Sequence, residues 1–72
     1  MLEYIIVGDT PRYEGCLVRV CGSDLENAEY ILNQMLNNPT PTDLRLMEGH
    51  SNFRIKPVEE EYQWWNDRVM AN

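Results

Sequence analysis

The run Tyr4-Ile5-Ile6-Val7 constrains the fold most, because it places apolar side chains on both faces of one strand. Tyr4 and Ile6 point to one side, whereas Ile5 and Val7 point to the other. A strand of this kind needs a cover on each face. In a chain of 72 residues, the run predicts the central strand of a small sheet, over residues 2–7, with helices or a second subunit as the covers.

A second strand is predicted at Cys16–Cys21, where Val18 and Val20 alternate with other residues and share a face with Cys16. The stretch 8–15 contains two glycines and a proline, which is typical of a hairpin loop longer than a tight two-residue turn. The two strands are therefore expected to pair antiparallel. The odd spacing of the two cysteines places them on opposite faces and indicates reduced thiols in a cytoplasmic compartment.

A long helix is predicted after Ser23, because Ser23-Asp24-Leu25-Glu26 has the pattern of a capping box. Asn37, Asn38 and Pro39 predict its end. At helical spacing, the apolar side chains between these limits form one continuous stripe. The stripe consists of Leu25, Ala28, Ile31, Leu32, Met35 and Leu36.

A second, shorter helix is predicted from Thr40 and Pro41 to Glu48, since threonine is a good cap and proline suits the first helical position. Gly49 is expected to terminate it. Apolar side chains also alternate along residues 44–47, so a strand over the same segment stays open as the alternative.

The last part of the chain predicts one strand and one helix. Phe53 and Ile55 alternate with basic residues, which indicates a half-buried third strand. Pro57 and the acidic run 59–61 then suit the first turn of a C-terminal helix. One face of that helix is predicted to carry Val58, Tyr62, Trp65 and Val69.

This order of elements predicts a single small α+β domain over residues 1–72. We expect a three-stranded sheet made of a β-hairpin and a third strand that returns beside the first. The long amphipathic helix, the short helix or strand and the C-terminal helix complete it.

Residues that carry chemistry are few. The zinc ligands available are Cys16, Cys21 and His50, and they lack the paired spacing of a structural zinc site. His50 is expected to be a solvated or backbone-bonded histidine in a turn. No glycine-rich phosphate-binding pattern is present in the sequence. We therefore expect no enzymatic activity, no cofactor and no metal.

The charge balance limits the classes of partner. Twelve acidic residues against six lysines and arginines give a net charge of −6. Nucleic-acid binding draws most of its affinity from basic side chains, so direct binding is not expected. The longest apolar run is far shorter than a membrane span requires, and no membrane association is expected.

Aromatic side chains outside the predicted core are the candidate binding residues. Trp64 falls off the apolar stripe of the C-terminal helix, and Tyr30 lies on the far side of the long helix from its core face. Exposed Trp and Tyr are enriched in protein interfaces. Arg68, one turn after Trp64, is a third candidate and stacks on the Trp64 ring in the alternative interpretation.

The leading hypothesis is a non-enzymatic protein-binding module that self-associates as a homodimer through Trp64 and the uncovered part of the sheet. One alternative is an acidic mimic of nucleic acid that inhibits a basic partner, in which case binding weakens steeply as salt rises. Another is a small-ligand binder with a pocket at a subunit interface, although no motif supports a small ligand. Small acidic domains of this kind are common among bacterial and phage accessory proteins, an analogy of composition alone.

Overall fold

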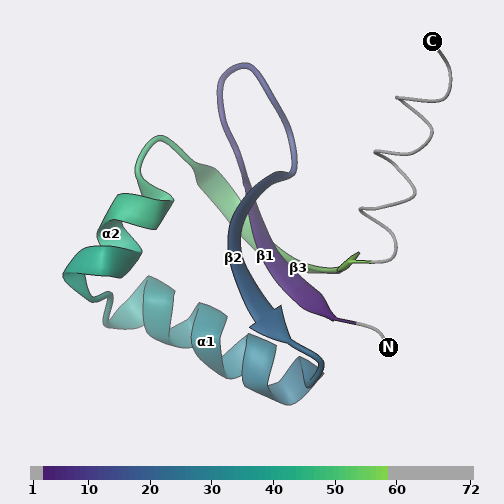
Figure 1. The fold of residues 1–72 in the computed structure, drawn as a ribbon. Coiled ribbons are helices and arrows are strands. Elements are labelled where there is room, and N and C mark those ends of the chain that lie inside the picture. The colour runs from purple at the N-terminus through teal and green to yellow at the C-terminus, as the bar shows by residue number, and fades with distance from the viewer. Residues whose placement is uncertain (1–2, 59–72) are drawn as a thin grey trace, which may run out of the picture.

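The computed structural model describes residues 3–58 of the chain. Its elements follow in the order β1 (Tyr4–Asp9), β2 (Cys16–Gly22), α1 (Leu25–Asn37), α2 (Pro41–Met47) and β3 (Ser51–Pro57). This is the predicted α+β fold (Figure 1). The expected C-terminal helix lies outside the described residues from residue 59 onward, including Trp65 on its apolar face. Pro57, which was predicted to open that helix, is instead the last residue of β3.

The three strands form one antiparallel sheet in the order β2-β1-β3, so β1 is central and the third strand returns beside the first. Ile5, Ile6 and Val7 of β1 are all buried, as expected for a strand that is apolar on both faces. Helix α1 packs against the face that carries Ile6. The core on that face is built from Ile6, Val18, Cys21, Ala28 and Met35.

The register of β2 against β1 is interrupted twice. Val7 pairs with Leu17 and Ile6 pairs with Arg19, so Val18 is an extra residue on β2. A second irregularity follows between the partners of Ile5 and Tyr4. Because each bulge adds one residue to β2, side chains no longer alternate between the two faces of the sheet along this strand.

The bulges change which side chains of β2 face the core. Val18 and Cys21 are buried, whereas Val20 is 56% exposed and Cys16 is only half-buried. The prediction that Cys16, Val18 and Val20 share one core face was therefore wrong. Both cysteines are free thiols, and the bulges remove the argument from odd spacing that placed them on opposite faces.

Helix α1 begins one residue later than the sequence pattern indicated. Asp24, not Ser23, is the N-cap, and its carboxylate accepts a hydrogen bond from the Glu26 amide over 3.1 Å. The first helical bond joins the Ala28 amide to the Asp24 carbonyl over 3.0 Å. Gly22, with φ of +89°, turns the chain just before this start. The cap is therefore an Asp cap, and the predicted Ser23 capping box was wrong.

We expect Asp24→Ala to lower the free energy of unfolding by about 1 kcal/mol, because the Glu26 amide then loses its acceptor. Ser23→Ala is the matched control and should leave the free energy of unfolding nearly unchanged. Urea denaturation of the two variants measures the difference. A larger loss from Ser23→Ala than from Asp24→Ala would contradict the cap seen here.

Fewer residues of the predicted apolar stripe on α1 contact the core than the sequence pattern indicated. Ala28 and Met35 are buried, and Ile31 and Leu32 pack against the core from its margin. The two end positions of the stripe, Leu25 and Leu36, are exposed.

The segment after α1 is a helix, and the alternative of a strand was wrong. Thr40 and Asp43 form a reciprocal capping box at the start of α2. The helix ends at Met47, one residue before the predicted limit, and Gly49 follows with φ of +80°. Leu44 and Leu46 point outward while Asp43 is buried. No helix within residues 3–58 is long and apolar enough to cross a membrane.

Candidate functional site

The structure places one of the three predicted binding residues. Tyr30 lies on α1 and is 62% exposed, as expected from the helical pattern. Trp64 and Arg68 lie outside the described residues. Their part in an interface stays a prediction.

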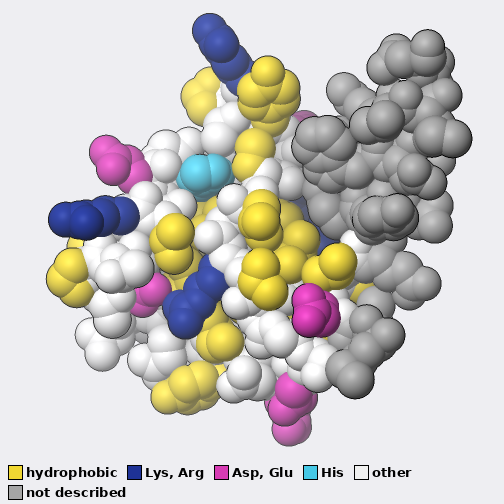
Figure 2. Space-filling view, in the orientation of Figure 1, with side chains coloured by type: hydrophobic (Ala, Val, Ile, Leu, Met, Phe, Trp, Pro, Cys, Tyr) yellow, Lys and Arg dark blue, Asp and Glu magenta, His cyan; other side chains and the backbone are white. Residues whose placement is uncertain are grey.

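A second exposed surface, which the sequence analysis missed, runs along β2 and the loop before it. We name it the β2 surface and define it by Tyr13, Leu17 and Val20, whose side chains are 67%, 58% and 56% exposed. Figure 2 shows hydrophobic side chains gathered over β2 and over the loop beyond it. Contiguous exposed apolar patches are typical of binding surfaces, and these three side chains are the candidates for one along β2.

The register fixes the side of the sheet that Leu17 and Val20 occupy. Leu17 pairs with Val7, and Val20 pairs with Ile5. Directly paired residues share a face of the sheet. Because α1 packs against the other face, through Ile6, Leu17 and Val20 lie on the face opposite α1.

The loop that carries Tyr13 is held by its own hydrogen bonds. The Thr10 amide donates to the Tyr13 carbonyl over 2.7 Å, and the Tyr13 amide donates to Thr10 Oγ1 over 3.0 Å. These bonds close a turn with Tyr13 at its exposed side. A fixed loop lowers the entropy that the Tyr13 ring loses on binding.

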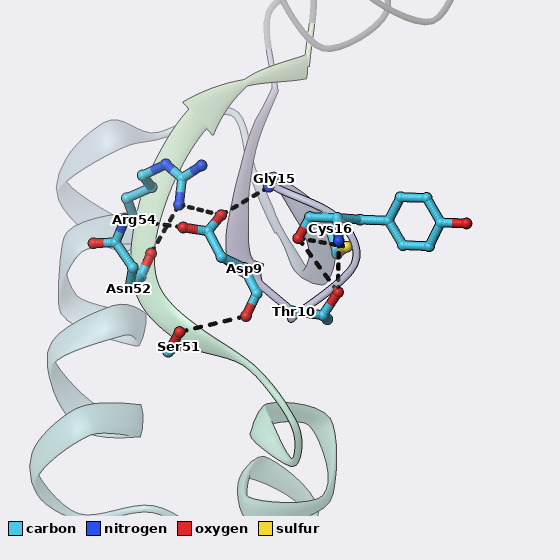
Figure 3. Close-up of polar contacts among 8 residues, drawn as sticks. Asp9, Thr10, Gly15, Cys16, Ser51, Asn52 and Arg54 are labelled. Atoms are coloured by element: carbon cyan, nitrogen blue, oxygen red, sulfur yellow. Dashed lines mark hydrogen bonds and ion pairs between the residues drawn. The ribbon is translucent and has the colours of Figure 1, made fainter.

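Asp9 anchors the base of this loop to β3 (Figure 3). Its carboxylate accepts hydrogen bonds from the Gly15 amide at 2.9 Å, from Asn52 Nδ2 at 3.0 Å and from the Arg54 guanidinium at 3.0 Å. In addition, the Ser51 hydroxyl donates to the Asp9 carbonyl over 3.5 Å. The Asp9 side chain thus links the two ends of the loop, at Asp9 and Gly15, to β3.

These contacts lower the pKa of Asp9 from 3.8 to about 2. The Gly15 amide is the largest cause, followed by the Asn52 amide, with the Arg54 guanidinium acting in the same direction. Partial desolvation opposes them. The folded protein therefore keeps this carboxylate charged to a lower pH than the unfolded chain does.

We expect Asp9→Asn to destabilise the protein at neutral pH and to have less effect in acid. The lowered pKa adds stability above pH 3.8, and this stability is lost as the pH falls toward about 2. The gap between the urea midpoints of wild type and Asp9→Asn should be constant near neutrality and should shrink below about pH 3.8. A gap that stays constant down to pH 2 would contradict the anchoring role of the charge.

Arg19 is the only charged residue of β2, and it is paired. Its guanidinium lies 3.2 Å from Asp43 Oδ1, on the helix side of the sheet. The other oxygen of Asp43 accepts from the Thr40 amide over 3.1 Å. The Arg19 guanidinium, which carries the charge of β2, thus points toward α2 and away from the β2 surface.

Among residues 3–58, no group of three His, Cys, Asp or Glu side chains is placed to hold a metal ion. His50 Nδ1 lies 3.0 Å from the Glu48 carbonyl oxygen, which is the arrangement of a backbone-bonded turn histidine.

Comparison with known protein families, with curated proteins and with solved structures gives no match. The exposed surface of the chain is therefore the basis for its proposed function.

Two sequence signals point to the β2 surface in retrospect. Tyr13 stands between Pro11 and Gly15 in a loop, where an aromatic ring has little core to pack against. In a simple alternation, neighbouring residues of a strand point to opposite faces, so Leu17 points to the face that Val18 does not occupy. Val20 carries no such signal, because its exposure depends on the bulges.

Proposed function

We propose that the chain is a non-enzymatic protein-binding module that self-associates as a homodimer through the β2 surface. The observation that carries this proposal is the exposure of Tyr13, Leu17 and Val20 beside the buried pair Ile5 and Val7. Tyrosine is enriched among the residues that carry most of the binding energy of protein interfaces, and burial of the apolar Leu17 and Val20 side chains adds to that energy. A partner that covers Leu17 and Val20 buries them next to Val7 and Ile5, the β1 residues with which they pair and which are already buried.

Charge favours an apolar contact over mimicry of nucleic acid. A mimic presents acidic side chains to its partner, whereas β2 carries none. Association through the β2 surface should therefore persist at high salt, because apolar burial is not screened. The free thiols Cys16 and Cys21 fit a reducing cytoplasmic compartment, which we include in the proposal.

Sedimentation equilibrium over a range of protein concentrations tests the proposal. We expect wild type to dimerise and Val20→Lys to remain monomeric, since a charge then sits within the β2 surface. Leu44→Lys is the matched control, because Leu44 on α2 is also 56% exposed and lies outside that surface. Circular dichroism should show both variants folded.

A wild type that stays monomeric at high micromolar concentration would contradict the proposal. A dimer that Leu44→Lys disrupts and Val20→Lys leaves intact would move the interface to the helices. Trp64→Ala in the same assay tests the predicted contribution of Trp64.

A further inference from the structure

We propose that residues 59–72 form a helix that lies back over the open face of the sheet and covers Ile5 and Val7 of the same chain. The open face is the side of the sheet that carries these two residues, opposite α1. The inference goes beyond the proposed self-association, because it concerns a single copy of the chain. The helix occupies the part of the open face over β1 and β3 and leaves Leu17 and Val20 free for a partner.

The burial of Ile5 and Val7 calls for a cover on the open face. Their side chains are 5% and 0% exposed, whereas α1 packs on the other face, through Ile6. Their neighbours on β2, Leu17 and Val20, are more than half exposed, so the cover does not come from the β2 side. A sheet that is apolar on both faces needs a further layer on each. The cover therefore lies over β1 and β3.

Two long side chains of β3 form the first part of this cover. Arg54 pairs with Val7 and Lys56 pairs with Ile5, so both share the open face. A Cβ atom at Gly15 would lie 3.8 Å from Arg54 Nη2 and 3.9 Å from Lys56 Nζ. Gly15 stands directly before β2, on the far side of β1 from β3, so both side chains extend across β1. Their aliphatic stems thus lie over the central strand, with their positive ends close together.

The charge of this layer favours an acidic occupant. Arg54 shares its charge with Asp9, at 3.0 Å, whereas Lys56 forms no ion pair within the described residues. Residues 59–72 contain four acidic residues against one arginine, and the acidic run 59–61 begins three positions after Lys56. Opposite charges at exposed positions add little to stability, but they favour one placement of the helix over others.

The segment is long enough to cover β1. Val58, the last described residue, donates its amide to the Glu3 carbonyl over 2.7 Å, so the chain leaves the sheet beside the start of β1. The 14 residues from 59 to 72 span about 21 Å as a helix, and the six residues of β1 span about 20 Å. A helix that turns back along β1 therefore covers the whole strand.

The apolar face of the segment supplies the second part of the cover. Tyr62, Trp65 and Val69 follow Val58 at helical spacing and share one face. Because the segment is tethered beside β1, its effective concentration at the open face exceeds that of a separate molecule. The tether favours the chain's own segment as the occupant over a second copy or another protein.

Tryptophan fluorescence tests the inference, because both tryptophans of the chain, Trp64 and Trp65, lie in the segment. In a Trp64→Phe background the emission comes from Trp65 alone. We expect emission at short wavelength and weak quenching by acrylamide, both unchanged when the protein is diluted until sedimentation shows a monomer. Val69→Lys should shift the emission to longer wavelength. Met70→Lys is the matched control, because Met70 lies about 100° from Val69 around the helix.

A second pair of variants tests the charged part of the contact. Lys56→Glu should increase quenching of Trp65 by acrylamide, because the acidic run then meets a negative charge. Arg45→Glu, the same change of charge on α2, should leave quenching unchanged. Nuclear Overhauser contacts from the Trp65 indole to the methyl groups of Ile5 and Val7 should locate the helix on the open face.

The outcomes separate this inference from the proposed self-association. Long-wavelength, strongly quenched emission from Trp65 would overturn the inference, as would Overhauser contacts to α1 or α2 in place of Ile5 and Val7. Short-wavelength emission that is lost on dilution would assign the contact to a second copy, which overturns the inference and supports self-association. A protein that stays monomeric and keeps the contact would support the inference and contradict the proposed dimer.

Discussion

Ile6→Ala is expected to remove about 3 kcal/mol from the free energy of unfolding, which approaches the entire stability of a domain of this size. Ile6 is fully buried and lies at the centre of the core between the sheet and α1. The hydrogen bonds of β1 to both neighbouring strands hold the backbone at this position. The cavity left by the missing side chain therefore has little freedom to collapse.

Urea denaturation monitored by circular dichroism measures this loss. Ile6→Val is a graded control, expected to cost about 1 kcal/mol because it removes one methylene. Leu17→Ala, at an exposed position, should change the free energy of unfolding of the monomer by less than about 0.5 kcal/mol. Equal effects of Ile6→Ala and Leu17→Ala would show that Ile6 is not the centre of the core.

Asp43→Ala is expected to lower the free energy of unfolding by about 2 kcal/mol. The buried carboxylate of Asp43 accepts a hydrogen bond from the Thr40 amide and another from the Arg19 guanidinium. Alanine removes both and leaves the start of α2 without one side of its capping box. The contact between α2 and β2 loses its ion pair at the same time.

Two further variants separate the contributions of the two Asp43 contacts, to the Thr40 amide and to Arg19, to this loss. Asp43→Asn keeps one oxygen acceptor and should fall between wild type and Asp43→Ala. Arg19→Ala should cost less than about 1 kcal/mol, because the Arg19 side chain is 40% exposed and solvent screens its charge. Thermal denaturation of the series should give the order Asp43→Ala, Asp43→Asn, Arg19→Ala from largest to smallest loss. A loss from Arg19→Ala equal to that from Asp43→Ala would assign the effect to the ion pair alone.

The interpretation of the β2 surface depends on these stability measurements. Val20→Lys reports on association only if the monomer remains folded. The stability of the monomer depends on buried side chains such as Ile6 and Asp43, and Val20 is not among them. A variant that dissociates the dimer without lowering the stability of the monomer therefore identifies an interface residue.

Elements whose signals are local could be predicted from the sequence alone. The cap of α2 involves Thr40 and Asp43, three residues apart, so its pattern is complete within one turn of helix. The apolar alternation along residues 44–47 nevertheless left a strand open over the rest of that segment. The double-sided burial of β1 follows from its unbroken apolar run. The exposure of Tyr30 follows from the period of α1. The strand order was inferred from the order of elements and the short connections between them.

The way in which β2 pairs and packs with its neighbours depends instead on contacts between distant segments. Its bulges arise from pairing with β1 across a loop, and they reverse the faces assigned to Val20 and Cys21. The partners of Asp9 on β3 and the pairing of Arg19 with Asp43 likewise join segments far apart in sequence. Side-chain alternation is a property of one strand, whereas register is a property of two. A single sequence pattern therefore predicts that a strand exists but leaves open which of its side chains a bulge turns outward.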